Sequence, residues 1–311
     1  MDFASRSLHL MGSTICISLC HERAEILLDE AVQLLHVYKN RFSANDEDSE
    51  LMTINHLAGI ESVSVHPELF ELIELGKYHS LAEGSHLNIT IGPLVQTWRI
   101  GFSDARLPSR EEIQQALSLT DPNFLELNPE DCSVFLAKKG MKLDLGALAK
   151  GYIADKIKDY LLSQGVTSAL INLGGNVLTI GQNAVSQRAW RIGIQNPKQP
   201  RGNHSAILAV TNQSVVTSGI YERTLTVEGQ NYHHILDRKT GYPIENQLAS
   251  LTIVSDKSVD GEIWTTRLFG ESPTSILSQI EEQAGIEALI ITQESQLFCS
   301  SGLLEQIIPA S

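Results

Sequence analysis

Long apolar runs, paired cysteines and an excess of basic side chains are all missing from this sequence of 311 residues. No stretch approaches roughly 18 consecutive apolar residues, the length that a membrane-spanning helix needs, so we expect no membrane insertion. The opening segment includes Asp2, Arg6 and His9 and lacks the continuous apolar stretch of a signal peptide. These absences favour a cytoplasmic protein.

The four cysteines are spread along the chain without any C-x-x-C pair, which argues against a structural zinc site. Cys16 and Cys20 lie in a segment that alternates like a β-strand. We therefore expect buried free thiols in a reducing compartment at Cys16, Cys20, Cys132 and Cys299.

Acidic side chains outnumber basic ones by 37 to 23, which gives a formal net charge of −14. Nucleic acids and anionic membranes repel such a chain, so neither is an expected partner. Hydrophobic residues make up 42% and charged residues 19% of the sequence, a composition typical of a globular protein with a sizeable core. No linker or repeat divides the chain, and we expect one compact domain over residues 1–311.

Hydrophobic periodicity and end signals predict helices mixed with strands, without regular βα alternation. The helices are expected at 22–39, 67–81, 109–119, 147–163, 260–270 and 273–284. The strands are expected at 8–19, 124–127, 133–143, 168–173, 177–180, 190–195, 206–211, 223–227, 233–236, 251–255, 288–292 and 296–299. This mixture favours an α+β fold over a doubly wound parallel sheet.

The segment KLDLGALAKGYIAD (142–155) has Asp144 just before a helix and Lys150 near its first turn. A helix N-terminus offers free N–H groups and partial positive charge, which suit a phosphate. Gly146 would let a ligand approach the backbone closely. The alternative is that Asp144 only caps the helix and that Lys150 is solvated.

Two further segments are each ambiguous. INLGGNVLTIG (171–181) lacks the spacing of a dinucleotide-binding fingerprint, so its glycine pair predicts a hairpin turn more strongly than close ligand approach. In VDGEIWTTRLFG (259–270), helical spacing would put Glu262 and Thr266 on one face. Their oxygen atoms suit Mg²⁺, although an ordinary half-exposed helix has the same pattern.

Adjacent histidines, His233 and His234, occur in a predicted strand and would point to opposite faces. Asp237 follows His234 by three residues, so a general base near a carboxylate is one interpretation. A core histidine satisfied by hydrogen bonds is the other.

Together these segments resemble the FAD:protein FMN transferases, the ApbE family. The resemblance covers nearly the whole chain, and the order of the matching stretches argues against chance. They are MGST (11–14), FSANDEDSELMTIN (42–55), LNITIGPLVQTWRIGF (87–102), LDLGALAKGYIAD (143–155), INLGGNV (171–177), VTSGIYERT (216–224), HHILDRKTGYP (233–243) and TTRLFG (265–270).

The resemblance implies an α+β fold with a T-fold-like core of mainly antiparallel sheets flanked by helices, and FAD held in a cleft. It also implies a reaction in which FAD is cleaved and FMN is attached through a phosphoester to a Thr or Ser of a partner flavoprotein. AMP is then released, and Mg²⁺ is required, with Mn²⁺ as an alternative metal. The partners would be FAD and an acceptor flavoprotein that carries a Thr/Ser acceptor motif.

The resemblance assigns roles to residues as well. His234, in an H-I-x-D pattern, would remove the proton of the acceptor hydroxyl, with Asp144 and Lys150 as further catalytic residues. FAD would be bound by Met11, His86, Leu87, Asn88, Asp144, Lys150 and Ile235. The metal would be held by the backbone carbonyl of Ala147 and by the side chains of Glu262 and Thr266.

Three positions depart from the family pattern. Glu262 stands in place of an aspartate and is one methylene longer, which makes Asp260 an alternative ligand. Asn88 replaces an aspartate beside the ligand, and Asn45 stands where an aromatic residue is common. These departures keep two alternatives open, an FAD pyrophosphatase that forms FMN and AMP, and an FAD-binding protein that has lost catalysis.

Overall fold

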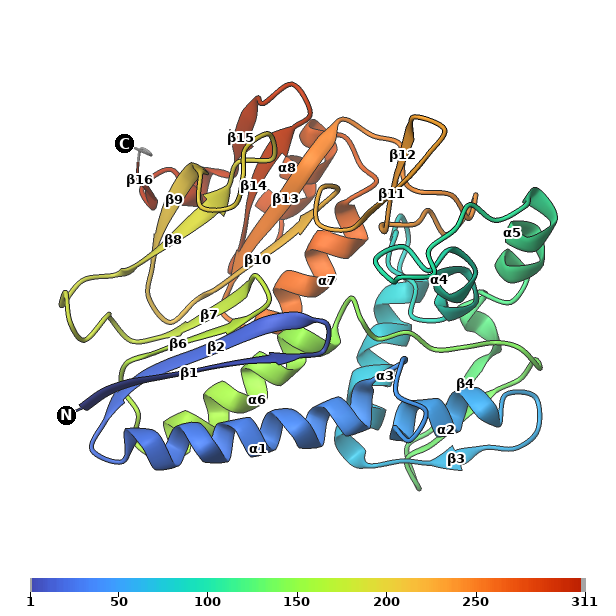
Figure 1. The fold of residues 1–311 in the computed structure, drawn as a ribbon, viewed down its shortest axis with the longest axis horizontal. Coiled ribbons are helices and arrows are strands. Elements are labelled where there is room, and N and C mark those ends of the chain that lie inside the picture. The colour runs from blue at the N-terminus through green and yellow to red at the C-terminus, as the bar shows by residue number, and fades with distance from the viewer. Residues whose placement is uncertain (1, 309–311) are drawn as a thin grey trace.

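An eight-stranded sheet crosses the centre of the structure, a computed structural model that describes residues 2–308 (Figure 1). Its strands lie in the order β1 (Asp2–Leu10), β2 (Ser13–His21), β6 (Ala169–Leu173), β7 (Asn176–Ile180), β10 (Ser214–Gly219), β13 (Leu248–Ser255), β14 (Ile286–Thr292) and β15 (Leu297–Cys299). Every strand pair within residues 2–308 is antiparallel. The predicted α+β class with mainly antiparallel sheets is therefore confirmed.

Four helices bury the apolar side of this sheet: α1 (Ala24–Phe42), α6 (Ala149–Ser163), α7 (Ser258–Leu268) and α8 (Pro273–Glu281). In β2, Ile15 and Ile17 alternate with exposed or half-buried residues and pack in one core cluster with Leu27 of α1. In β13, Leu251 packs with Phe269 in a second cluster. The two-residue period of the strands thus directs apolar side chains toward the helices.

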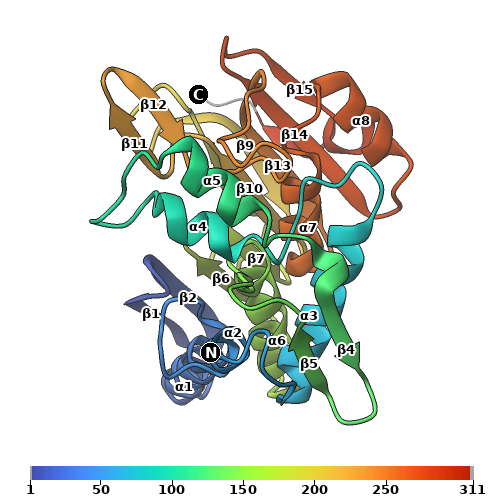
Figure 2. The same cartoon turned by 90° about the vertical axis from the view of Figure 1, so that its right-hand side faces the viewer.

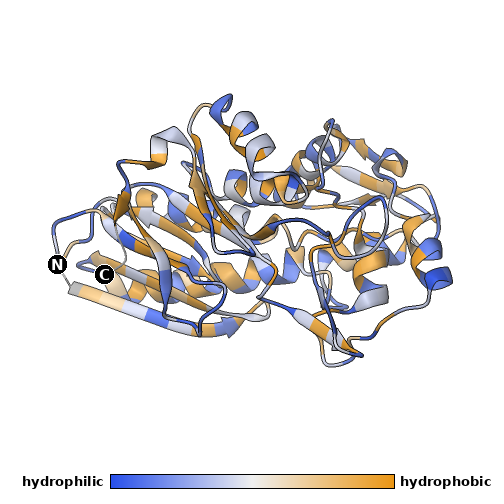
Figure 3. Cartoon of the chain, turned by 90° about the horizontal axis from the view of Figure 1, so that it is seen from above, coloured by the Kyte–Doolittle hydropathy of each residue, from blue (hydrophilic) through white to orange (hydrophobic). Residues whose placement is uncertain are grey.

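A small sheet covers the opposite face, consisting of β8 (Trp190–Gln195), β9 (His204–Val210) and β16 (Ile307–Ile308). It packs on the other set of alternating side chains, including Val215, Val254 and Leu289. The β1–β2 part of this face carries polar side chains instead, and the hydroxyls of Ser5 and Ser18 are 2.9 Å apart. In the hydropathy view, hydrophobic and hydrophilic segments accordingly alternate along the strands (Figure 3).

The chain between α1 and α6 forms a separate group of elements beside the sheet. They are α2 (Glu50–His56), β3 (Val63–Ser64), α3 (Pro67–Leu81), α4 (Gly92–Trp98), α5 (Arg110–Leu117), the 3₁₀ turn Pro122–Phe124, β4 (Leu125–Asn128) and β5 (Ser133–Leu136). A hairpin of β11 (Thr224–Val227) and β12 (Gln230–His233) lies beside α4 and α5 (Figure 2). The Trp98 indole contacts Tyr232 and donates a 2.9 Å hydrogen bond to the Gly241 carbonyl, which ties α4 to this hairpin.

Several expectations need correction. The single strand expected at 8–19 is the hairpin β1–β2, because Met11 and Gly12 adopt positive φ values of 51° and 68° and turn the chain. Strand β10 and helices α2 and α4 were not expected. The four cysteines are free, as predicted, but half-buried rather than buried. Within residues 2–308, no helix has both the length and the apolar character needed to cross a membrane.

Candidate active site

Asp144 and Lys150 lie on either side of the start of α6. The Asp144 N–H donates to the Ile89 carbonyl at 2.8 Å, and its Oδ1 accepts a 2.8 Å hydrogen bond from the Gly146 N–H. Asp144 thus closes a turn before the helix instead of capping the helix itself. Lys150, the second residue of α6, is half-buried.

Burial raises the pKa of the Asp144 carboxyl. The Gly146 N–H and the charge of Arg223 act in the opposite direction and compensate only in part. Because burial disfavours the charged form of this carboxyl group, a cation placed beside it would stabilise the carboxylate.

Helices α6 and α7 cross closely, and this crossing holds Glu262 of α7 against the first turn of α6. A Cβ at Gly151 of α6 would lie 2.6 Å from the Ser258 carbonyl oxygen and 2.7 Å from Cγ of Glu262, so only glycine permits this approach. Burial raises the pKa of the Glu262 carboxyl, and the nearby Lys150 charge lowers it in part. Two residues expected in separate roles, Glu262 as a metal ligand and Lys150 as a catalytic residue, therefore lie close enough for the lysine charge to act on the carboxylate.

A buried polar chain fixes the orientation of Glu262. Its Oε1 accepts a 2.9 Å hydrogen bond from Nδ2 of Asn176, the first residue of β7. The Asn176 Oδ1 accepts a 2.7 Å bond from the Ser258 hydroxyl, which itself accepts a 2.9 Å bond from the Ser214 hydroxyl. The expected glycine turn, Gly174–Gly175, connects β6 to β7 and starts β7 at Asn176.

His234 lies one residue beyond the end of β12, not within a strand as expected. Its Nδ1 is 3.4 Å from the Arg223 carbonyl oxygen. Since a carbonyl only accepts hydrogen bonds, Nδ1 carries the proton of the neutral ring and Nε2 keeps its lone pair. Burial, followed by the charge of Arg223 and a smaller effect of Lys150, lowers the pKa of His234 to about 4.

Asp237 does not orient His234. Its Oδ1 accepts hydrogen bonds from the N–H groups of Lys239 at 2.6 Å and Thr240 at 3.0 Å, so it stabilises the turn that follows. The neighbouring His233 is the core histidine of the pair, with Nε2 placed 2.9 Å from the Ile244 carbonyl oxygen. His233 therefore fits the interpretation of a histidine satisfied by hydrogen bonds, and the general-base role of His234 stays a prediction.

The remaining residues expected to bind FAD are distributed over three places. Met11 is half-buried at the β1–β2 turn, and Ile235 is half-buried beside His234. Nε2 of His86 is 3.6 Å from a Glu271 carboxylate oxygen, and Leu87 is 1% exposed.

Asn88 is occupied by internal hydrogen bonds. Its Nδ2 donates to the Thr120 carbonyl at 2.7 Å, while Oδ1 accepts from the N–H and the hydroxyl of Thr90. It lies at the edge of a cavity of about 360 Å³ that Arg238 also lines. The amide therefore stabilises the loop after Leu87, a role that an ionised aspartate would fill only in part because it lacks the donor.

A larger cavity of about 720 Å³ adjoins the end of the β11–β12 hairpin. His233, Tyr221, Tyr232 and Tyr242 contribute to its wall. His234 is not among the lining residues, so the cavity meets this segment through His233.

No cluster of three or more His, Cys, Asp or Glu side chains suited to a metal ion occurs in the described part of the chain. A metal would therefore need the mixed oxygen donors expected from the sequence, the Glu262 carboxylate, the Thr266 hydroxyl and the Ala147 carbonyl. Glu262 and Thr266 lie one turn apart on α7, and within residues 2–308 the Thr266 hydroxyl and Oε2 of Glu262 have no hydrogen-bond partner. Such hard oxygen donors fit Mg²⁺.

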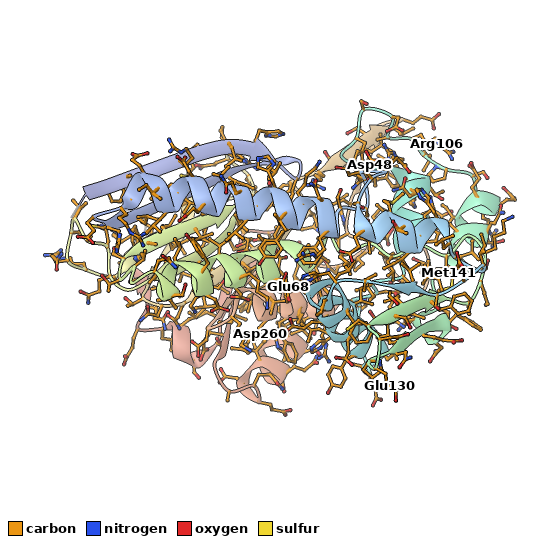
Figure 4. The ribbon with its side chains drawn as sticks, turned by 90° about the horizontal axis from the view of Figure 1, so that it is seen from below. Asp48, Glu68, Arg106, Glu130, Met141 and Asp260 are labelled. Atoms are coloured by element: carbon orange, nitrogen blue, oxygen red, sulfur yellow. The ribbon has the colours of Figure 1, made fainter. Side chains whose placement is uncertain are left out.

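Asp260, labelled in Figure 4, lies near the start of α7. The charges that affect its pKa are those of Lys257 and Asp256, whereas Glu262 is affected by Lys150. The two carboxylates consequently have different surroundings, and only Glu262 adjoins the start of α6.

Two residues of this site were not singled out from the sequence. Arg223 supplies the carbonyl beside His234 and a charge that acts on both His234 and Asp144. Asn176 holds Glu262. Both occur in stretches that carry the family resemblance, VTSGIYERT and INLGGNV, but no local periodicity points to them.

Comparisons with known proteins define the class of this fold and site. The sequence model of the ApbE family matches residues 11–290, and the chain belongs to this family. A FAD:protein FMN transferase of Klebsiella pneumoniae (strain 342) is 42% identical over 297 residues, which cover 96% of this chain and 92% of the relative. A FAD:protein FMN transferase of Treponema pallidum (strain Nichols) is 33% identical, covering 90% of this chain and 81% of the relative.

Solved structures agree with this assignment. The crystal structure of the ApbE protein from Thermotoga maritima is similar with a TM-score of 0.89 and 26% identity, covering 97% of this chain and 98% of that one. The flavin transferase ApbE from Vibrio cholerae gives a TM-score of 0.84 at 25% identity and covers 98% of this chain and all of the other.

Proposed function

We propose that this chain is a Mg²⁺-dependent FAD:protein FMN transferase. It would cleave FAD, attach FMN through a phosphoester to a Thr or Ser of an acceptor flavoprotein, and release AMP. The observation that carries the proposal is that the charge of Lys150, in α6, acts on both Glu262 of α7 and His234 after β12, three residues from separate segments. The 42% identity with a FAD:protein FMN transferase supports it independently.

In the proposed reaction, the acceptor hydroxyl oxygen forms a bond to the FMN phosphorus. The bond between that phosphorus and the bridging oxygen breaks, and its electron pair leaves with AMP. The hydroxyl proton passes to Nε2 of His234, which is free because Nδ1 faces the Arg223 carbonyl. Lys150 would neutralise charge on the transferred phosphoryl group.

The ligands proposed for Mg²⁺ are the Glu262 carboxylate, the Thr266 hydroxyl and the Ala147 carbonyl. A bound magnesium ion supplies Lewis-acid stabilisation of phosphoryl oxygens. Asn176 would keep one Glu262 oxygen engaged and leave the other available for the ion. The longer side chain of Glu262 is compatible with this arrangement, since its Cγ packs closely against Gly151.

For FAD, we propose contacts with Met11, Asp144, Lys150 and Ile235, and with the segment His86–Leu87–Asn88 along the dinucleotide. Asp144 and Lys150 border the same helix start, and Met11 and Ile235 supply half-buried apolar surface for a planar ring. Asn88 would contribute through the shape of its loop, because its own polar atoms are already bonded.

The test uses purified protein, FAD and Mg²⁺, with and without a flavoprotein domain that bears the acceptor motif. A matched acceptor with its Thr or Ser changed to Ala serves as the control. AMP is followed by chromatography and the acceptor mass by mass spectrometry. An acceptor that gains one FMN per AMP released, and only when the hydroxyl is present, supports the transferase.

Two other outcomes correspond to the alternatives. AMP accompanied only by free FMN would identify an FAD pyrophosphatase. Bound FAD without any AMP at saturating Mg²⁺ or Mn²⁺ would identify a flavin-binding protein without catalysis.

A further inference from the structure

Arg223 lies in the loop between β10 and β11, and its side chain passes close to Gly101 and Gly12. A Cβ at Gly101 would lie 2.7 Å from Cδ of Arg223, so the alkyl part of the arginine occupies the space that a side chain would fill. Gly101 has a φ of +94°, which also favours glycine. A Cβ at Gly12, in the β1–β2 turn, would lie 3.9 Å from a terminal guanidinium nitrogen.

This path carries the guanidinium to the border of the site. Its charge opposes the rise in the pKa of Asp144 that burial causes, and it adds to the effect of burial in lowering the pKa of His234. Within residues 2–308 the guanidinium has neither a hydrogen-bond partner nor an ion pair. The nearby Arg201, by contrast, forms a 2.5 Å ion pair with Glu222, the residue that directly precedes Arg223.

We propose that Arg223 binds the diphosphate of FAD as a second cation beside Lys150. This assignment depends on the function proposed above, since it names the residue that recognises the charged bridge of that substrate. A guanidinium presents its N–H donors as a planar fork that matches two phosphate oxygens. Gly12 and Gly101 leave its approach open because neither carries a side chain.

The main chain of the same residue has a separate role. The Arg223 carbonyl accepts the Nδ1–H of His234, so it positions the ring through an atom that no substitution at 223 removes. One residue would thus hold the phosphoryl group through its side chain and orient the base through its backbone. The side-chain role is the one that mutation isolates.

The experiment measures equilibrium binding of a ligand series to the wild type and to Arg223→Gln. FAD and ADP contain the diphosphate, whereas riboflavin lacks any phosphate. We expect the Kd for FAD and for ADP to rise roughly tenfold or more, as for the loss of a charge-assisted hydrogen bond, with riboflavin affected less than about twofold. The salt dependence of ADP binding should also become weaker.

Matched variants sharpen the result. Arg191→Gln removes the same charge from β8, where Arg191 is exposed, and should leave all three affinities unchanged. Arg223→Lys retains the charge but loses the fork, and should retain part of the affinity for ADP. Circular dichroism spectra identical to that of the wild type establish that each variant is folded.

Unchanged affinity for FAD and ADP in Arg223→Gln would overturn the assignment, and so would an equal loss for riboflavin. These results are distinct from failure of the proposed function. A wild-type protein that releases no AMP refutes the transferase, whereas the binding series still decides whether Arg223 recognises a diphosphate.

Discussion

Asn176 donates a 2.9 Å hydrogen bond from Nδ2 to Oε1 of Glu262, although 86 residues separate them in the chain. The bond joins the first residue of β7 to the middle of α7 inside the protein. Because the Ser258 hydroxyl fixes the other end of the Asn176 amide, the carboxylate is held in one orientation. The position of Glu262 is therefore set by the sheet as well as by its own helix.

Asn176→Ala should destabilise the protein. The change leaves buried Glu262 without its donor and the Ser258 hydroxyl without its acceptor, which costs about 1–3 kcal/mol of unfolding free energy. Urea denaturation at pH 7 measures the difference. Asn45→Ala, at an exposed position, is the control and should change the free energy by less than about 0.5 kcal/mol. Equal effects of both variants would argue against the polar chain.

His234→Ala should slow AMP release and FMN transfer by roughly 10²–10⁴-fold, as for the loss of a general base. The Kd for FAD should change much less, because the proton transfer involves the acceptor hydroxyl. Single-turnover kinetics and FAD titration give the two quantities. His233→Gln, at the adjacent residue, should affect the rate far less. Equal losses in rate and FAD affinity would remove the general-base role.

Glu262→Gln should weaken binding of Mg²⁺ or Mn²⁺, since an amide lacks the negative charge of the carboxylate. Titration of Mn²⁺ in the presence of FAD, followed by electron paramagnetic resonance, reports the affinity without any turnover. Asp260→Asn is the matched control, with the same chemical change two residues away on α7. If Asp260→Asn causes the larger loss, the metal ligand is Asp260 and the assignment of Glu262 is wrong.

Stability should depend on His79 at mildly acidic pH. Burial, with the charge of Arg267, lowers the pKa of His79 to about 4, from about 6.5 in the unfolded chain. Between these values the unfolded state binds more protons, so the free energy of unfolding falls as the pH drops from about 6.5 toward 4. His79→Gln should remove part of this fall, on the order of 1 kcal/mol after allowance for partial exposure. Parallel profiles for both proteins in urea denaturation would contradict this origin.

Gly151→Ala should separate α6 from α7. The added Cβ would lie 2.6 Å from the Ser258 carbonyl oxygen, a backbone atom that cannot move away cheaply. We expect a loss of about 1–3 kcal/mol in unfolding free energy, as for overpacking of a core. Differential scanning calorimetry measures it. Ser163→Ala, at the exposed end of α6, is the control, and a Gly151→Ala variant as stable as this one would argue against the close crossing.

The sequence predicts helix ends and tight turns well, because interactions between residues close in the chain determine them. The predicted helix 67–81 matches α3 (Pro67–Leu81), because Pro67 and the apolar periodicity define it within a few residues. The helix predicted at 109–119 corresponds to α5 (Arg110–Leu117), which begins with a capping box formed by Ser109 and Glu112. The glycine pair at 174–175 forms the hairpin turn that the sequence predicts, between β6 and β7.

Other features depend on contacts between distant segments. Met11 adopts a positive φ that its residue type does not favour, so the sequence pattern predicts one strand where the structure has the hairpin β1–β2. The place of Arg223 follows from two glycines at 12 and 101, which belong to different elements. The family resemblance nominated Asp144, Lys150, His234 and Glu262, but only the packing of α6 against α7 reveals which of them meet.

The order of strands in the large sheet also bears on how the protein folds during synthesis. The hairpin β1–β2 is made before its neighbour β6, which follows only after a long insertion. Helix α1 comes directly after β2 and covers Ile15 and Ile17 at once. We therefore expect α1 to shield the apolar side of the nascent hairpin from aggregation until the segment that supplies Asp144 and Lys150 has been made.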